Sequence, residues 1–277
     1  MDPMTGPTWI LLRGLTRERR HWGSFAQTFA DAVPTARVIA LDLPGNGALY
    51  RQASLLSVAD MARHCRRELQ RLDVPPPYHL LAMSLGAMVA TAWAARHPQE
   101  LAGAVLINTS MRPFSPPQQR LRPRNLGPLL RLLLAAPGSL AREEAVLRLT
   151  SNLPQRDAAV PALTTPTALI ALITEWADWQ RECPVSRANA LRQLWAAARW
   201  QAPRVRPAVA LLLLTSTADA LVDTRCSQQL ARHWACPLAA HPWAGHDLPL
   251  DDAPWVAEQV RAWLASQPQR DAALIHT

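Results

Sequence analysis

The sequence predicts an α/β protein in which a mainly parallel sheet is covered by helices on both faces. Over residues 1–111, short apolar strand patterns alternate with helix patterns, which is typical of parallel strands joined by crossover helices. Between residues 112 and 202, helix patterns follow one another without a convincing strand. We therefore expect a core formed by residues 1–111 and 203–277, with a helical cap inserted at 112–202.

The expected strands are short aliphatic and β-branched runs that end in turns, as expected for buried strands. In chain order they are Trp9–Leu12, Arg37–Leu41, Tyr78–Ala82, Ala104–Ile107, Val209–Leu214 and Pro237–His241. Helical spacing of apolar residues predicts the core helices, and prolines separate the helices of the cap. The core patterns include Val58–Leu72 and Pro254–Leu264, and the cap patterns are Leu126–Ala136, Ala141–Leu149, Thr167–Glu182 and Ser186–Trp200.

Composition fits one enzyme-sized domain, since 277 residues with 49% hydrophobic side chains can bury a large core. The four cysteines form no C-x-x-C pair, so we expect free thiols, no metal and no other cofactor. The N-terminal residues lack a signal-peptide pattern, and no apolar run approaches the roughly 20 residues of a membrane helix. The sequence thus predicts a cytoplasmic protein without stable membrane insertion. The cysteines are Cys65, Cys183, Cys226 and Cys236.

The net charge of +8 raises the question of a nucleic-acid partner. Every basic residue is an arginine, and the arginine clusters are interrupted by acidic or apolar residues, as on an ordinary solvated surface. No nucleic-acid-binding motif is present, so we expect no such partner. The positive field favours anionic substrates at low salt. The oligomeric state is left open.

Ser84 carries the strongest functional signal. An apolar strand pattern ends just before it, and an apolar helix pattern begins just after it. The small residues Ala82 and Gly86 allow a tight strand-to-helix turn, which exposes the serine Oγ and places backbone N–H groups beside it. We therefore expect Ser84 to be a nucleophile.

A serine nucleophile needs a histidine base and a carboxylate that orients it. His246 is the best candidate base, because it follows the small pair Ala244-Gly245 after a strand. Asp219 is the best candidate acid, because it follows the most apolar strand, at the sheet edge where α/β sites form. The rivals are Asp223 and His241, the second of which falls inside a strand pattern.

Together these segments resemble the α/β-hydrolase family, which uses the chain order Ser, Asp, His. Arg13-Gly14 resembles the family's His-Gly turn, with arginine in place of histidine, and Ala82 replaces the first glycine of the serine motif. The matching runs are Trp9–Leu15, His21-Trp22, Ala40–Gly47, Ala82–Gly86, His97-Pro98, Ala104–Asn108, Leu211–Leu214 followed by Thr217–Val222, and Ala244–His246.

The resemblance implies an α/β-hydrolase fold and an oxyanion hole formed by the backbone N–H groups of Leu15 and Leu85. It implies a substrate pocket between core and cap, for which the candidates are Arg13, Met83, Trp176 and Trp179. For at least half of the cap tryptophans we favour simple packing between cap and core. For Arg13 we favour a structural hydrogen-bonding role.

The predicted function is cleavage of carboxylic esters through an acyl-enzyme on Ser84. Val58–Ala62 and Asn108–Phe114 also resemble, more distantly, the biotin-pathway carboxylesterases, which cut a methyl ester on a carrier-bound acyl chain. The substrate is therefore expected to be a small-molecule or acyl-carrier-bound ester. Thioester and lactone hydrolysis, carbon–carbon bond cleavage and acyl transfer stay open, as does a non-catalytic ligand-binding role.

Overall fold

The computed structural model describes residues 6–155 and 165–267. Its centre is a six-stranded sheet of order β2-β1-β3-β4-β5-β6, in which all neighbouring strands are parallel. This confirms the predicted α/β class. The strands are β1 (Thr8–Leu12), β2 (Arg37–Leu41), β3 (Tyr78–Met83), β4 (Leu101–Ile107), β5 (Ala210–Ser216) and β6 (Leu238–His241).

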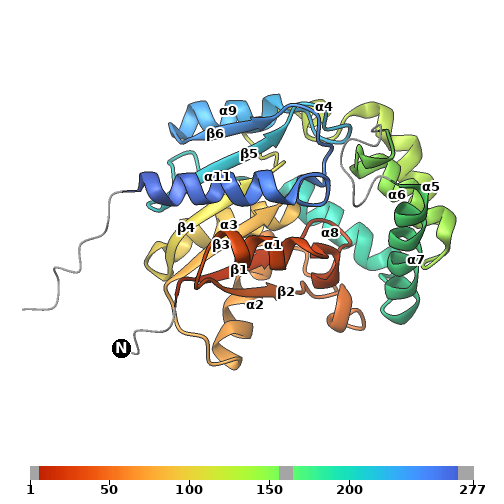
Figure 1. The fold of residues 1–277 in the computed structure, drawn as a ribbon, viewed down its shortest axis with the longest axis horizontal. Coiled ribbons are helices and arrows are strands. Elements are labelled where there is room, and N and C mark those ends of the chain that lie inside the picture. The colour runs from red at the N-terminus through yellow and green to blue at the C-terminus, as the bar shows by residue number, and fades with distance from the viewer. Residues whose placement is uncertain (1–5, 156–164, 268–277) are drawn as a thin grey trace, which may run out of the picture.

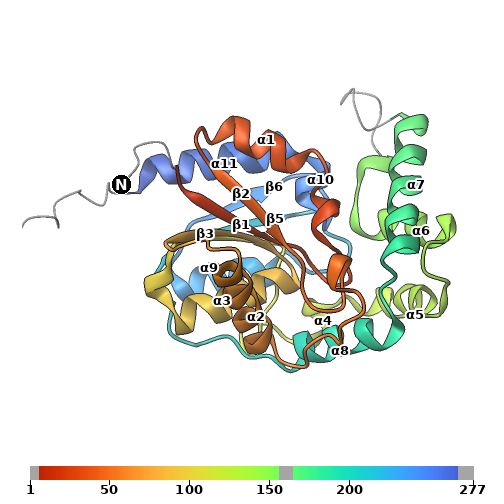
Figure 2. The ribbon, with the colours of Figure 1, turned by 90° about the horizontal axis from the view of Figure 1, so that it is seen from below.

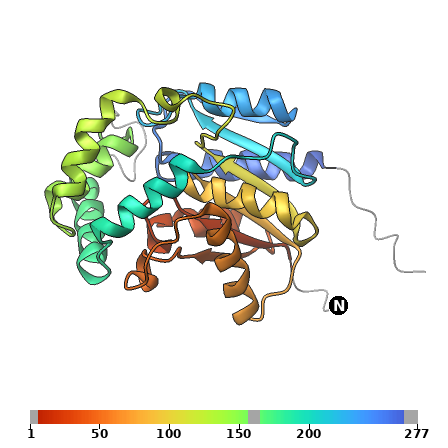
Figure 3. The same ribbon diagram turned by 180° about the vertical axis from the view of Figure 1, so that it is seen from behind.

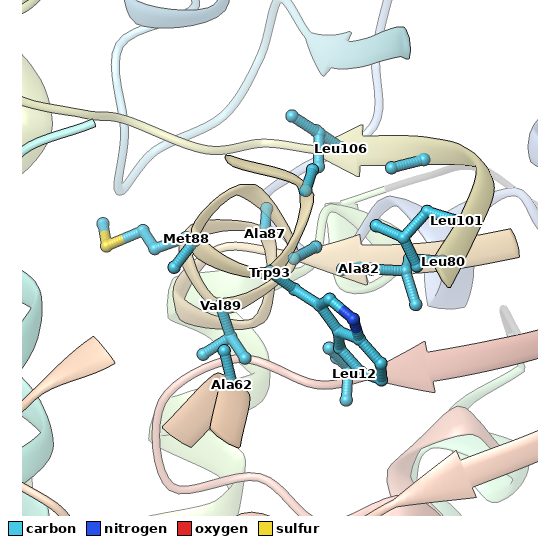
Figure 4. Close-up of a cluster of buried hydrophobic side chains, with 14 of the residues drawn as sticks. Leu12, Ala62, Leu80, Ala82, Ala87, Met88, Val89, Trp93, Leu101 and Leu106 are labelled. Atoms are coloured by element: carbon cyan, nitrogen blue, oxygen red, sulfur yellow. The ribbon is translucent and has the colours of Figure 1, made fainter. Parts of the chain in front are cut away.

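Helices cover both faces of the sheet (Figure 2). One face carries α1 (Phe25–Ala32) and α11 (Ala253–Ser266), and the other carries α2 (Val58–Arg71), α3 (Leu85–Arg96) and α9 (Arg225–Trp234). Alternate strand residues supply the two apolar clusters, which is why the strands are apolar on both sides. Figure 4 shows part of the larger cluster, with Trp93 of α3 among side chains from β1, β3 and β4.

Short elements complete the core at the turns of the chain. They are the 3₁₀ helices η1 (Arg19–Trp22), η2 (Gly47–Leu49) and η3 (Pro98–Glu100), and the helix α10 (Leu248–Asp251). Within the described residues, no helix is long and apolar enough to cross a lipid bilayer.

The segment between β4 and β5 is helical in its described part, as predicted. Helices α5 to α7 lie beside the sheet, and α8 runs back toward the core (Figures 1 and 3). Side-chain N-caps from Ser139, Thr165 and Ser186 explain where α6, α7 and α8 begin. The elements are α4 (Pro117–Arg120), η4 (Pro123–Asn125), α5 (Leu126–Leu134), α6 (Leu140–Thr150), η5 (Leu153–Gln155), α7 (Pro166–Glu182) and α8 (Arg187–Arg199).

The two ends of this segment meet. Arg112 pairs with Gln201 in an isolated parallel bridge, and the Ala202 N–H donates to the Arg112 carbonyl at 2.7 Å. The chain thus leaves and re-enters the core at one narrow neck. On this basis we keep residues 112–202 as the proposed cap, of which residues 156–164 lie outside the described residues.

Candidate functional site

Ser84 occupies a tight turn between the end of β3 and the start of α3. Its backbone angles are φ 53° and ψ −117°, a conformation that non-glycine residues rarely adopt. The turn is held by the Ser84 N–H, which donates to the Ile107 carbonyl at 2.9 Å. A Cβ at Gly86 would lie 2.4 Å from the Leu12 carbonyl oxygen. The chain packs so closely here that glycine is required two residues after the serine.

The two candidate oxyanion donors lie in segments that flank this turn. Leu85 is the first residue of α3, where a helix leaves its N–H groups without intrahelical partners. Leu15 follows Gly14, at which a Cβ would lie only 3.2 Å from the Ser84 Cβ. The loop after β1 therefore passes directly beside Ser84.

His246 and Asp219 form a buried pair. The His246 Nδ1 lies 2.7 Å from the Asp219 Oδ2, and both side chains are less than one-tenth exposed. The other carboxylate oxygen accepts the N–H groups of Leu221 and Val222 at 2.8 and 3.0 Å, which fixes the carboxylate. Burial lowers the His246 pKa, but the charge and hydrogen bond of Asp219, with the charge of Asp247, outweigh it and hold the pKa above its ordinary value.

Asn108, at the end of β4, links the histidine loop to β5. Its Nδ2 donates to the carbonyls of His246 at 2.8 Å and Gly245 at 3.2 Å, and to the Ser216 Oγ at 3.0 Å, while its Oδ1 accepts the Ser216 N–H at 2.8 Å. The next residue, Thr109, donates from Oγ1 to the Ser84 carbonyl at 3.1 Å. Two consecutive residues thus bind the backbones of Ser84 and His246, which brings the serine turn and the histidine loop together.

The cap also holds the histidine loop. Asp247 donates its N–H to the Thr150 carbonyl at 2.7 Å. The Asp251 carboxylate accepts from the Ser151 hydroxyl and from the N–H groups of Asn152 and Gly245, at 2.5 to 3.0 Å. Burial raises the Asp251 pKa to about 6. The end of α6 is therefore part of the support of the site.

The two rival residues have other partners. Asp223 binds the Arg225 guanidinium at 2.7 Å, and this contact lowers its pKa to about 2. The His241 Nε2 lies 3.1 Å from Asp252, and its Nδ1 accepts the Ala244 N–H at 3.0 Å. His241 therefore shapes the turn that leads into His246.

The pocket candidates Trp176 and Trp179 lie at the joint between cap and core. The Arg17 guanidinium stacks 4.2 Å from the centre of the Trp176 ring and binds the buried Glu143 of α6 at 2.9 Å. His21 packs against both tryptophan rings, at 5.5 and 5.1 Å between centroids. A role of these tryptophans in substrate binding stays a prediction.

Arg13 and Met83 are both buried at the carboxyl end of the sheet. Met83, the last residue of β3, packs in the apolar cluster below α1 and α11. Arg13 forms a two-pronged ion pair with Asp247, with Nη1 to Oδ1 at 3.1 Å and Nη2 to Oδ2 at 2.5 Å. The carboxylate partner of Arg13 was not identified from the sequence. The sequence does contain a signal for this pair: Arg13 stands where the family has histidine before Gly14, and the oppositely charged Asp247 directly follows His246.

The fold and the site define the class of protein. Ser84, Asp219 and His246 follow three parallel strands in the order of a hydrolase site at the carboxyl edge of an α/β sheet. Among the described residues, no group of three His, Cys, Asp or Glu side chains is placed to hold a metal ion. A family profile described as "alpha/beta hydrolase fold" matches residues 7–241. The chain belongs to this family.

Related sequences match over shorter segments. The chain is 33% identical over 110 residues to the pimeloyl-[acyl-carrier protein] methyl ester esterase of Chromobacterium violaceum, which is 39% of each chain. It is 32% identical over 104 residues to the biotin biosynthesis bifunctional protein BioHC of Teredinibacter turnerae, covering 36% of this chain and 17% of that protein. The chain thus spans well under half the length of either relative.

Solved structures share the fold over nearly the whole chain. A thermophilic esterase from Thermogutta terrifontis superposes with a TM-score of 0.70 at 20% identity, covering 94% of this chain and 90% of that one. The enol-lactonase of Burkholderia xenovorans LB400 superposes with a TM-score of 0.72 at 16% identity, covering 96% and 94%. At these identities the likeness concerns the fold alone.

Proposed function

We propose that the protein is a serine hydrolase that cleaves carboxylic esters through an acyl-enzyme. The observation that carries this proposal is the buried contact of 2.7 Å between His246 Nδ1 and Asp219 Oδ2, in a loop that Asn108 binds while the next residue, Thr109, binds the Ser84 turn. A buried carboxylate on Nδ1 fixes the imidazole tautomer in which Nε2 accepts a proton. This is the arrangement that activates a serine hydroxyl.

In the proposed reaction, Ser84 Oγ attacks the ester carbonyl carbon while His246 Nε2 takes the hydroxyl proton. The N–H groups of Leu15 and Leu85 stabilise the oxyanion, and the imidazolium returns its proton to the departing alcohol. A water molecule, deprotonated by His246, then attacks the acyl-enzyme, and the imidazolium returns this proton to Ser84 Oγ as the acid is released. Asp219 stabilises the imidazolium in both halves of the reaction.

The first test is hydrolysis of p-nitrophenyl esters from acetate to palmitate, together with labelling of Ser84 by a fluorophosphonate. We expect turnover and labelling by the wild-type protein. Ser84→Ala should lose both, with a fall in kcat of several orders of magnitude. If the wild type is inert to every ester and to the probe, the proposal is wrong and a ligand-binding role is favoured.

We further propose that the natural ester is carried by an acidic acyl-carrier protein. The 33% identical relative is named for a carrier-bound methyl ester, and residues 112–202 contain twelve arginines against six carboxylates. This proposed cap therefore holds most of the net charge of the chain, which favours encounter with an anionic partner.

The carrier proposal predicts a difference between two substrates. Arg131→Gln, on the exposed side of α5, should lower kcat/KM for a carrier-bound methyl ester several-fold at low salt and leave the free methyl ester unchanged. The matched control Arg37→Gln lies at the opposite, amino-terminal end of the sheet and should affect neither. Equal rates on both esters, independent of salt, would exclude the carrier.

We propose a cytoplasmic location. The four cysteines are unpaired, and three of them are buried. Free thiols are typical of a reducing compartment.

A further inference from the structure

The ion pair between Arg13 and Asp247 joins two loops that are 234 residues apart in sequence. Arg13 lies between β1 and Gly14, in the loop that carries the proposed oxyanion donor Leu15. Asp247 directly follows the proposed base His246. Both side chains are almost fully buried, at 2% and 4% exposure.

The geometry of this contact restricts both side chains. Two parallel N–H···O bonds fix the plane of the guanidinium relative to the carboxylate. The Arg13 guanidinium also lies 4.9 Å from the centre of the Trp22 ring, which packs against its face. The loop after β1 therefore cannot shift against the histidine loop without breaking the two hydrogen bonds between Arg13 and Asp247.

Stability alone does not account for a buried ion pair. Desolvation of two charges offsets most of their attraction, so apolar residues of similar volume are often as stable. The Asp247 backbone is already anchored, because its N–H binds Thr150 and its carbonyl accepts from Leu250 and Asp251. The side chain of Asp247 is therefore not needed to anchor the backbone of its loop.

The pair also acts on the proposed base through its charges. The charged groups with the largest effect on the His246 pKa are Asp219 from the loop after β5, Asp247 from its own loop, and Arg13 from the loop after β1. Asp247 raises the His246 pKa and Arg13 lowers it, so the two effects oppose each other.

We propose that Arg13 and Asp247 are a positioning pair, which holds the proposed oxyanion loop against the histidine loop and sets their spacing for ester cleavage. This inference rests on the proposed function. The two side chains bind each other, and Arg13 also packs on Trp22, so the pair acts through its neighbours Leu15 and His246. A displacement of about 1 Å in such loops can cost on the order of 100-fold in rate.

The test compares Arg13→Gln, Asp247→Asn and the double variant on the best p-nitrophenyl ester, across pH. We expect each single variant to lower kcat by about 10- to 100-fold with little change in KM, and the double variant to be no worse than the poorer single one. The rising limb of kcat/KM should move to higher pH in Arg13→Gln and to lower pH in Asp247→Asn. It should return near the wild-type position in the double variant.

Two further variants separate positioning from general stability. Arg13→Lys keeps the positive charge but loses the paired hydrogen bonds to Asp247. The kcat should therefore fall, while the pH at which kcat/KM rises should stay the same. Arg66→Gln removes a two-pronged pair between α2 and Glu100, at the amino-terminal end of β4, and should change neither kcat nor the pH at which kcat/KM rises. The proposal would be overturned if both single variants kept the wild-type kcat and the wild-type pH dependence of kcat/KM. It would also be overturned if the variants changed only KM, or if the losses in kcat added up in the double variant. An inert wild type would instead refute the proposed function.

Discussion

Replacement of Asn108 by alanine tests whether one buried amide holds the histidine loop in place. The side chain is 1% exposed, and its four contacts use one acceptor and two N–H donors, one of them shared between two carbonyls. At about 1 kcal/mol for each of these three groups, their loss costs about 3 kcal/mol. Asn108 also has φ 44°, which asparagine tolerates better than alanine by about 1 kcal/mol.

The expected loss for Asn108→Ala is therefore about 4 kcal/mol in the free energy of unfolding, measured by urea titration. Asn108→Gly is the matched control. Glycine tolerates the positive φ but does not replace the hydrogen bonds, so Asn108→Gly should lose about 3 kcal/mol of unfolding free energy.

Activity should report the same contact. Both variants release the carbonyls of Gly245 and His246, so kcat on a p-nitrophenyl ester should fall by on the order of 100-fold. The reasoning fails if Asn108→Ala loses less than 1 kcal/mol, or if Asn108→Gly matches the wild type in stability or in kcat.

Three further predictions concern the serine turn, the base and the cap contact. Gly86→Ala should lose about 3 kcal/mol of unfolding free energy in urea, because its methyl group would meet the Leu12 carbonyl. Gly127→Ala is the control, because a Cβ at Gly127 would meet open space, and it should be neutral or slightly stabilising. Equal losses of stability in the two variants would contradict the packing argument. The kcat/KM profile should rise with pH through a pKa above 6.5, because the raised pKa of His246 keeps it protonated, and inactive as a base, below that value; a limb at or below 6.5 would contradict this. The raised Asp251 pKa means that folding favours its protonated form, so this group's contribution to stability is lost as pH rises from about 4 to about 6. Relative to Asp251→Asn, the wild type should lose up to about 3 kcal/mol over that range in urea titrations, and a constant difference would refute the assignment.

The fold was predictable because its signals are local. Continuous apolar runs such as Val209–Leu214 can be satisfied only inside a sheet covered on both faces, and the alternation with helices set the parallel direction. The ends were less accurate: β4 begins at Leu101, three residues before the predicted start. Ala102 and Gly103 carry no β-branched or bulky side chain, so pairing with β3, rather than propensity, extends this strand.

The geometry of the candidate site could be anticipated from the sequence only where a residue's neighbours in sequence shape its backbone. The turn around Ser84 and the loop around His246 carry small residues that mark a tight backbone. The contacts of Arg13, Asn108 and Asp251 depend on which loops meet in space. Each side chain is polar and buried, but a sequence shows neither burial nor the partner across 100 or more positions.

The closed neck at Arg112 and Gln201 has a consequence for protein engineering. A different inserted segment joined at those two positions would leave the chain ends of the core side by side. Such a segment would also have to replace Thr150 to Asn152, which bind the histidine loop and α10, and the contacts that Glu143 and Trp176 make with Arg17. Exchange of this segment between related proteins is therefore simple at the neck but constrained wherever its helices contact the core, and chimeras should be selected for both features.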